Sequence, residues 1–249
     1  MRTLPLLILT ITLTLASSIR ADEPKPAAPL PDGYKLVYSN DFDSPESLKG
    51  LQATDIDAWK FTKEGKSGGA IEQFKKSDYK YKVRSPFNIA LIDGHTFGDF
   101  VLEVDLQQTG KEYGHRDMCL FFNLVDRNHF YYIHMSTKSD PHAHNVFIVN
   151  DKPRTKISHK TSDGIRWGEG NWRHVRIERD TKAGTIKLFW EDMSEPIMEA
   201  KDDTFKRGFI GFGSFDDTGK VDNVRIWAPP GSMKKTDQKD IFKEGQPKE

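Results

Sequence analysis

Apolar and polar residues alternate along many short segments of this chain. In the segment 97–108, FGDFVLEVDLQQ, the apolar residues Phe100, Leu102, Val104 and Leu106 occupy every second position. Successive side chains of a β-strand point to opposite faces, so this spacing predicts a strand with one face toward a core. Comparable strands are predicted at 117–124, 129–135, 145–150, 172–180, 185–192 and 208–215.

Short polar turns separate these segments, including VDRN at 125–128 and TKAG at 181–184. Asp, Asn and Gly favour tight turns because they tolerate the backbone angles that such turns need. Helical periodicity is almost absent from the chain. The pattern therefore predicts an all-β fold, a two-sheet antiparallel jelly-roll sandwich with a single core.

Two further strand patterns lie near the ends of the patterned region, YKLVYSNDFD at 34–43 and KVDNVRIW at 220–227. They resemble the opening "VWSDEFD" and closing "VDYVRVY" strands of concanavalin A-like lectin/glucanase domains, especially laminarinase-type glycoside hydrolases. The motif GSFDDTG at 213–219 is also similar to uncharacterised exported bacterial members of that superfamily. The resemblance implies a concanavalin A-like β-sandwich over 33–228 and a carbohydrate context.

The two ends of the chain lack this strand pattern. Residues 1–21 combine Arg2, an apolar stretch and small residues at the end, which is the pattern of a secretory signal peptide. Residues 22–32, DEPKPAAPLPD, are rich in proline and charge, and predict a flexible linker. Residues 229–249 are predicted to form a mobile charged tail. We therefore expect an exported protein in the periplasm, at the cell surface or outside the cell.

Charge and cysteine content narrow the classes of partner. Lysine and arginine number 37, as do aspartate and glutamate, and removal of Arg2 and Arg20 with the signal would leave 35 basic residues. This balance argues against a dedicated nucleic-acid or anionic-membrane binder, and no later segment is long and apolar enough for a membrane span. Cys119 is the single cysteine, so no intramolecular disulfide can form, and its apolar strand indicates a packed thiol.

The strand at 97–108 also carries Glu103 and Asp105 on its other face. This Glu-x-Asp run resembles the E-x-D-x-x-E catalytic strand of laminarinase-like enzymes, but Gln108 stands where the final glutamate would be. A retaining glycosidase needs two carboxyl groups, one as nucleophile and one as acid/base. The motif is incomplete, and a solvated strand face is the preferred interpretation of these two residues.

Aromatic and polar residues share one face of the segments 117–124 and 129–135. If these strands are neighbours, Phe121, Asn123, Tyr132 and His134 converge on the concave sheet, where rings can stack on sugars and polar groups can bind hydroxyls. The alternative is that these rings pack beneath covering loops.

Three more residues in loops are candidate carbohydrate ligands. His142 and His144 lie in the loop 136–145, just after the strand that carries His134, and Trp167 lies in the segment GIRWGEGNW. A histidine can act as a base or bind a metal, although a His-x-His loop lacks the spacing of a recognised zinc site. The indole of Trp167 would serve as an exposed stacking surface for a glycan.

A catalytic role is open for three residues. Polysaccharide lyases on jelly rolls use arginine, histidine and tyrosine to neutralise a uronate and remove a proton, and Arg116, His134 and Tyr132 supply these residue types. The ordered motifs of those lyases are missing. The three residues are therefore candidates by residue type alone.

The resemblance also implies a structural calcium ion between the terminal strands. Its ligands in laminarinase-like domains correspond to Asp41 and Asp222, and calcium prefers such carboxylate oxygens. Asp41 stands in place of the usual glutamate, which shortens its reach. The alternative is that Asp41 and Asp43 cap amides of the first turn.

The sequence as a whole favours an exported, non-catalytic, lectin-like domain that binds polysaccharide or glycan on its concave sheet. A glycoside hydrolase or polysaccharide lyase of the same fold is the enzymatic alternative. A third hypothesis is a structural module that meets a protein partner.

Overall fold

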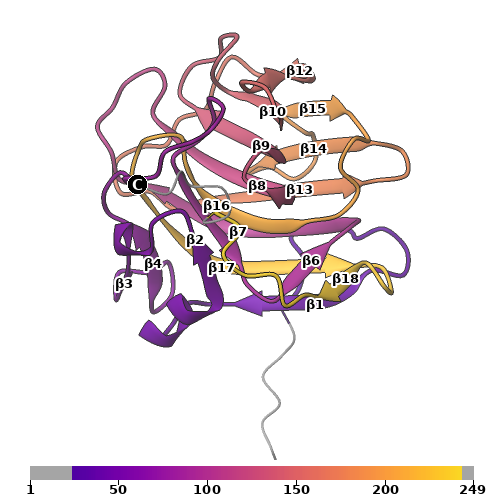
Figure 1. Cartoon of the computed structure of the whole chain (residues 1–249), viewed down its shortest axis with the longest axis horizontal. Helices are drawn as coiled ribbons and strands as arrows, with labels where there is room; N and C mark the ends of the chain where they lie inside the picture. The colour runs from indigo at the N-terminus through magenta and orange to yellow at the C-terminus, as the bar shows by residue number, and fades with distance from the viewer. Residues whose placement is uncertain (1–23, 243–249) are drawn as a thin grey trace, which may run out of the picture.

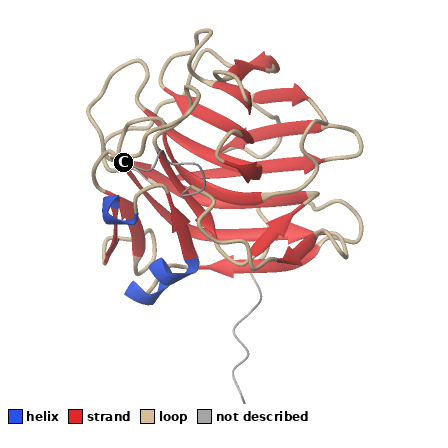
Figure 2. Ribbon diagram, viewed as in Figure 1, coloured by secondary structure: helices blue, strands red, loops and turns tan. Residues whose placement is uncertain are grey.

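The computed structural model describes residues 24–242, and the predicted signal peptide at 1–21 lies outside them. Figure 2 shows that strands dominate, with two short 3-10 helices, η1 (Pro45–Gly50) and η2 (Ile56–Ala58). No helix among residues 24–242 is long and apolar enough to cross a membrane. The predicted all-β class and antiparallel two-sheet architecture are confirmed.

Two large antiparallel sheets form the sandwich (Figure 1). The nine-stranded sheet contains, in order, β12 (Ser158–Thr161), β15 (Met198–Lys201), β14 (Thr185–Trp190), β13 (Arg173–Asp180), β7 (Phe100–Gln108), β17 (Gly219–Ala228), β4 (Ala70–Gln73) and β3 (Trp59–Thr62), with β1 (Lys35–Asn40) also paired to β17. The seven-stranded sheet contains β11 (Thr155–Lys156), β10 (Asn145–Asn150), β9 (His129–Ser136), β8 (Asp117–Asp126), β16 (Phe209–Ser214), β5 (Asn88–Ile92) and β2 (Leu51–Ala53).

The main core lies between the two sheets and follows the alternation in the sequence. Phe100, Leu102, Val104 and Leu106 of β7 are buried in it, as predicted, and Phe100 contacts Phe122 of β8 with ring centroids 6.0 Å apart. The segments at the two ends of the patterned region pair directly, since Leu36 of β1 lies opposite Trp227 of β17. Leu36 and Trp227 are 191 residues apart in the sequence, so the sandwich is closed by a pairing that no local pattern encodes.

A second apolar cluster covers the outer face of the seven-stranded sheet. We call it the outer cluster; its fully buried members are Tyr79, Ile89, Leu91, Cys119, Phe121, Leu124, Phe130, Tyr132, Phe147, Val149, Phe209, Ile241 and Phe242. The cover comes from the loop around Tyr79 and from residues 239–242, the C-terminal segment. Tyr79 and Phe242 meet edge to face with centroids 5.9 Å apart.

This packing corrects the prediction of a mobile tail over 229–242. β18 (Met233–Lys235) pairs with β6 (His95–Phe97), and Ile241 and Phe242 are only 3 % and 4 % exposed. Ile241 and Phe242 pack on the apolar outer face of the sheet, and contacts of Gln52 with Gln238 and of Asp93 with Lys239 also hold the segment. The rest of the predicted tail, 243–249, lies outside the described residues.

The proline-rich segment also differs from the flexible linker that its composition predicts. Residues 24–30, the N-terminal segment, lie over the outer face of the nine-stranded sheet. The Ala27 amide donates to the Glu103 carboxylate at 3.0 Å, and Arg176 donates to the carbonyls of Ala28 and Pro29 at 3.1 and 2.8 Å. Proline has no N–H to donate, so a proline-rich segment does not extend a sheet, and its carbonyls accept here from a buried side chain of the sheet.

Candidate functional site

The strands β8 and β9 are neighbours, as the carbohydrate hypothesis requires. Phe121 lies opposite Tyr132, and Cys119 lies opposite His134. Tyr132 stacks between Phe121 and Phe147, with centroid distances of 5.9 and 5.1 Å. All three rings are buried in the outer cluster. The alternative interpretation of these rings is therefore confirmed: they pack beneath covering segments and do not form an open surface for sugars.

Asn123 leaves this face altogether. A β-bulge after Phe122 gives Asn123 a positive φ of 43°, and its amide donates to the Phe97 carbonyl at 3.1 Å while its oxygen accepts from Arg179 Nε at 2.9 Å. A bulge interrupts the two-residue alternation, which is why the sequence pattern misplaced this side chain.

The side chains of Arg116 and Trp167 are also buried in the interior of the protein. The Arg116 guanidinium donates to Gln108 and pairs with Glu112, and the Trp167 indole donates to the Arg116 carbonyl at 3.2 Å. Trp167 is 1 % exposed and packs against Trp190. The prediction of an exposed Trp167 stacking surface is wrong, because Trp167 belongs to the main core and Trp190 packs against it.

One end of the outer face opens into a pocket of about 180 Å³. We call it the Phe215 pocket; it is lined by Arg84, Tyr113, His115, His134, His142, Arg154, Phe215 and Asp216. Two of the predicted carbohydrate ligands, His134 and His142, meet here. Tyr113 is 44 % exposed, so its ring is open to a ligand.

His134 is held as a neutral ring at the base of this pocket. Burial and the nearby Arg154 lower its pKa to about 3. Its Nδ1 accepts the His144 amide at 3.3 Å, so the proton of the neutral ring resides on Nε2, which faces Asp117 Oδ2 at 3.7 Å. A nitrogen that carries a proton cannot bind a metal, so this hydrogen bond argues against a metal held by Asp117, Cys119 and His134, whose ligand atoms converge.

His144 has a structural role. Its Nδ1 accepts the Ser136 amide at 3.2 Å, its Nε2 faces Ser162 Oγ at 2.9 Å, and burial lowers its pKa to about 4. This histidine is fully buried and ties the loop 136–145 to neighbouring segments. The prediction that it contacts a glycan is not supported by this placement.

Three carboxylates converge beside the pocket: Asp117, Asp216 and Asp217. Asp117 is fully buried and accepts the Phe215 amide at 2.8 Å, and Asp217 accepts the Tyr113 hydroxyl at 2.7 Å and the Asp117 amide at 3.0 Å. Burial and the charge of Asp217 raise the pKa of Asp117. The repeated acid in the motif GSFDDTG is the sequence signal that could have indicated this cluster.

Asp41 and Asp222 do not belong to either convergent group among the described residues. Asp41 pairs with Arg225, whereas Asp222 accepts the amides of Lys66 and Ser67 at 2.8 and 3.3 Å. Asp43 accepts the amide of Gly69 at 2.8 Å, which lies in a distant segment and not in the first turn that the alternative interpretation named. Calcium between Asp41 and Asp222 stays a prediction.

Glu103 and Asp105 lie on the outer face of the nine-stranded sheet, opposite the core, as the alternation predicts. They are buried, however, and not solvated. His174 lies between them, with Nδ1 hydrogen-bonded to Asp105 at 2.9 Å and Nε2 at 3.5 Å from Glu103, and the two carboxylates raise the pKa of His174 to about 9. Although burial raises the pKa of Glu103, its hydrogen bonds with His174 and Arg176 lower it overall.

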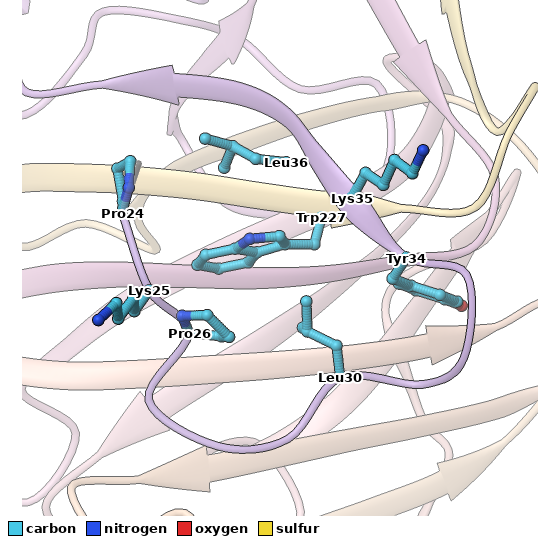
Figure 3. A pocket seen from close by; sticks show the side chains of 8 residues that line it. All are labelled: Pro24, Lys25, Pro26, Leu30, Tyr34, Lys35, Leu36 and Trp227. Carbon is cyan, nitrogen blue, oxygen red and sulfur yellow. The ribbon is translucent and has the colours of Figure 1, made fainter. Parts of the chain in front are cut away.

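The N-terminal segment also forms one wall of a groove of about 630 Å³ (Figure 3). Trp227 lies at its base between Pro26 and Leu36, and Lys25 and Lys35 point away from the indole. Trp227 is only 3 % exposed, so little of its ring could stack on a sugar. The Phe215 pocket is therefore the better candidate for a polar ligand.

Comparison with solved structures finds proteins of similar architecture. The carbohydrate binding module CBM66 from Bacillus subtilis is 20 % identical, with a TM-score of 0.53 over 72 % of this chain and 96 % of that one. The fold is a concanavalin A-like jelly roll. Winged bean acidic lectin, solved with methyl-α-D-galactose, is 10 % identical, with a TM-score of 0.53 over 81 % of this chain and 99 % of the lectin.

A galectin-like protein of unknown function from Bacillus subtilis is also similar, at 12 % identity and a TM-score of 0.50 over 79 % of this chain and 99 % of that protein. No family model matches the chain, and no curated protein matches it. At these identities the likeness shows the fold alone.

Proposed function

We propose that this protein is an exported carbohydrate-binding domain that holds its ligand in the Phe215 pocket. The observation that carries the proposal is the pocket itself, where the exposed ring of Tyr113 lies beside Arg84, Arg154 and Asp216 on a jelly roll. A sugar needs this combination, because its apolar face stacks on an aromatic ring while its hydroxyls bind polar groups. Solved neighbours of the fold include a carbohydrate-binding module and a lectin.

The size of the pocket favours recognition of a small part of a glycan. Pockets for drug-sized ligands measure about 300–1,000 Å³. At about 180 Å³, the Phe215 pocket suits a single sugar ring, such as a chain end or one residue of a polysaccharide. The ligand would then reach the sheet at its open end, since the outer cluster covers Phe121 and Tyr132.

Binding without catalysis is the function that these residues support best. Asp216 is the carboxylate in the pocket lining, whereas Asp117 is fully buried and bonded to the Phe215 amide. Hydrolysis with retention needs two carboxyl groups that both reach the glycosidic bond. The lyase candidates also diverge, because Arg116 is bonded to Gln108 and Glu112, away from Tyr132.

The proposal is tested by a glycan array followed by calorimetry on the full chain, with and without calcium. We expect Tyr113→Ala to weaken binding to the array's best ligand about tenfold, because stacking of a sugar ring on an aromatic side chain is worth about 1 kcal/mol or more. Phe74→Ala, at a second exposed ring outside the pocket, is the matched control and should bind normally. Failure of the folded protein to bind any glycan would refute the function; equal binding by Tyr113→Ala would refute the site.

A further inference from the structure

Two arginines of the Phe215 pocket converge on one aromatic ring. The guanidinium carbon of Arg154 lies 4.1 Å from the centroid of Phe215, and that of Arg84 lies 5.4 Å from the same centroid. The two side chains come from separate segments of the chain, and a backbone hydrogen bond of 3.1 Å from the Arg154 amide to the Arg84 carbonyl joins these segments. Two positive charges are thus held at the mouth of a single pocket.

Arg154 is fixed in place but has unused donors. Its Nη2 donates to the His142 carbonyl at 3.0 Å, while its Nε and Nη1 are buried without a hydrogen-bond partner. A second ring, Phe147, lies 5.4 Å from the same guanidinium. The buried Tyr132 hydroxyl lies near these donors, and the guanidinium lines the pocket as a positive charge, which favours an anionic ligand there.

The acidic residues nearby are already engaged. Asp216 faces Lys76 at 3.9 Å, Asp140 pairs with His115 at 2.5 Å, and Asp217 accepts the Tyr113 hydroxyl. Among residues 24–242, neither Arg84 nor Arg154 forms an ion pair with a carboxylate. The positive charge of Arg154 is strong enough at the base of the pocket to help lower the pKa of His134.

We propose that the Phe215 pocket selects an acidic sugar, with Arg84 and Arg154 bound to its carboxylate or sulfate group. This inference rests on the proposed carbohydrate function and names the class of ligand. An anion relieves the repulsion between the two guanidiniums, and arginine pairs with carboxylate and sulfate oxygens through charge-assisted hydrogen bonds. Tyr113 then contacts the apolar face of the same ring.

A matched pair of ligands tests the charge. We expect galacturonan oligosaccharides to bind the full chain at least about tenfold more tightly than the same oligosaccharides methyl-esterified, because the ester has no negative charge to form charge-assisted hydrogen bonds with the arginines. A sulfated glucan and its unsulfated parent distinguish sulfate from carboxylate as the recognised group. Affinity for the acidic ligand should fall as salt rises.

Variants test the residues. Arg154→Gln and Arg84→Gln should each reduce the preference for acid over ester about tenfold, and Arg154→Lys should retain part of it through its charge. Arg166→Gln, at an exposed arginine outside the pocket lining, is the control and should keep the preference. Thermal melting of each variant confirms that it is folded.

The outcomes separate the two proposals. Equal affinity for galacturonan and its ester, or equal affinity for galacturonan and the sugar-free polyanion polyglutamate, would overturn the acidic-sugar inference. A third outcome is tight binding to neutral glycans, weakened by Tyr113→Ala but not by Arg154→Gln. This result would also overturn the acidic-sugar inference, but it would support the carbohydrate function. No binding to any glycan would refute both.

Discussion

The outer faces of the two sheets are covered by opposite kinds of contact. Over the nine-stranded sheet, the N-terminal segment is held by Glu103 and Arg176, which are 3 % and 1 % exposed and bond to its backbone. Over the seven-stranded sheet, the C-terminal segment is held mainly by Ile241 and Phe242 in an apolar cluster, with an ion pair between Lys239 and Asp93 beside it. The comparison teaches that one sandwich fastens its two chain ends by two different forces, polar pairing and apolar burial.

We call the contacts of the N-terminal segment the polar cover and those of the C-terminal segment the apolar cover. The two covers should respond to different perturbations. Breaking the apolar cover exposes hydrophobic surface, while breaking the polar cover leaves buried charges without partners. The polar cover should also depend on pH, because His174 takes part in it.

The largest effect is expected from the double variant Ile241→Ala/Phe242→Ala. Loss of two buried apolar side chains should lower the free energy of unfolding by about 4–6 kcal/mol, measured by urea denaturation. Phe74→Ala is the control, and at 41 % exposure it should cost about 1 kcal/mol or less. An unchanged midpoint in the double variant would mean that the C-terminal segment adds no stability, as the sequence pattern alone suggested.

Glu103→Ala should lower the free energy of unfolding by about 3 kcal/mol, because it leaves the buried Arg176 with Glu178 as its remaining carboxylate partner. Limited proteolysis should then cut the N-terminal segment faster. Glu72→Ala, which breaks a more exposed pair with Lys60, should cost about 1 kcal/mol or less. Equal losses in the two variants would show that the polar cover has no special role.

The polar cover should weaken at alkaline pH. The pKa of His174 is raised from its ordinary 6.5 to about 9, so its stabilisation is complete below pH 6.5 and is lost as pH rises through 9. Allowing for the partial exposure of the ring, we expect wild type to lose about 1–2 kcal/mol more than His174→Gln between these limits. Parallel pH profiles of the two proteins by urea denaturation would contradict this assignment.

The opposite face should weaken at acidic pH through His144. Burial lowers its pKa to about 4, so its contribution is present above pH 6.5 and is lost as pH falls through 4. Between pH 6.5 and 5, wild type should lose about 1 kcal/mol more than His144→Gln. The raised pKa of Asp117 acts in the other direction, but it is common to both proteins and cancels in the difference. His174→Gln should keep the wild-type loss over this range.

The smallest effect is one of rate. Cys119 is buried in the outer cluster, and burial and Asp117 raise its pKa, so a thiol reagent should label the native protein very slowly. Labelling should accelerate in Ile241→Ala/Phe242→Ala, which opens the apolar cover, and should stay slow in Glu103→Ala under native conditions. Equal acceleration in both variants would mean that the covers are coupled.

The sequence by itself determined the strands and the faces of the core. Alternation placed Phe100, Leu102 and Val104 inward because the two-residue period of a strand is a local property of the backbone. It also placed Glu103 and Asp105 on the opposite face. The resemblance of the two terminal segments indicated the concanavalin A-like jelly roll, which the solved neighbours confirm.

Only the tertiary structure decided what covers each face and where a ligand has room. The period of a strand is the same whether its outer face meets water or another segment, so the pattern could not show that Phe121 and Tyr132 are buried in the outer cluster. The bulge at Asn123 and the convergence of Arg84 and Arg154 on Phe215 likewise depend on contacts between residues distant in sequence. Such contacts are fixed by the packing of the whole chain, since a local pattern carries no information about which distant segment will lie above it.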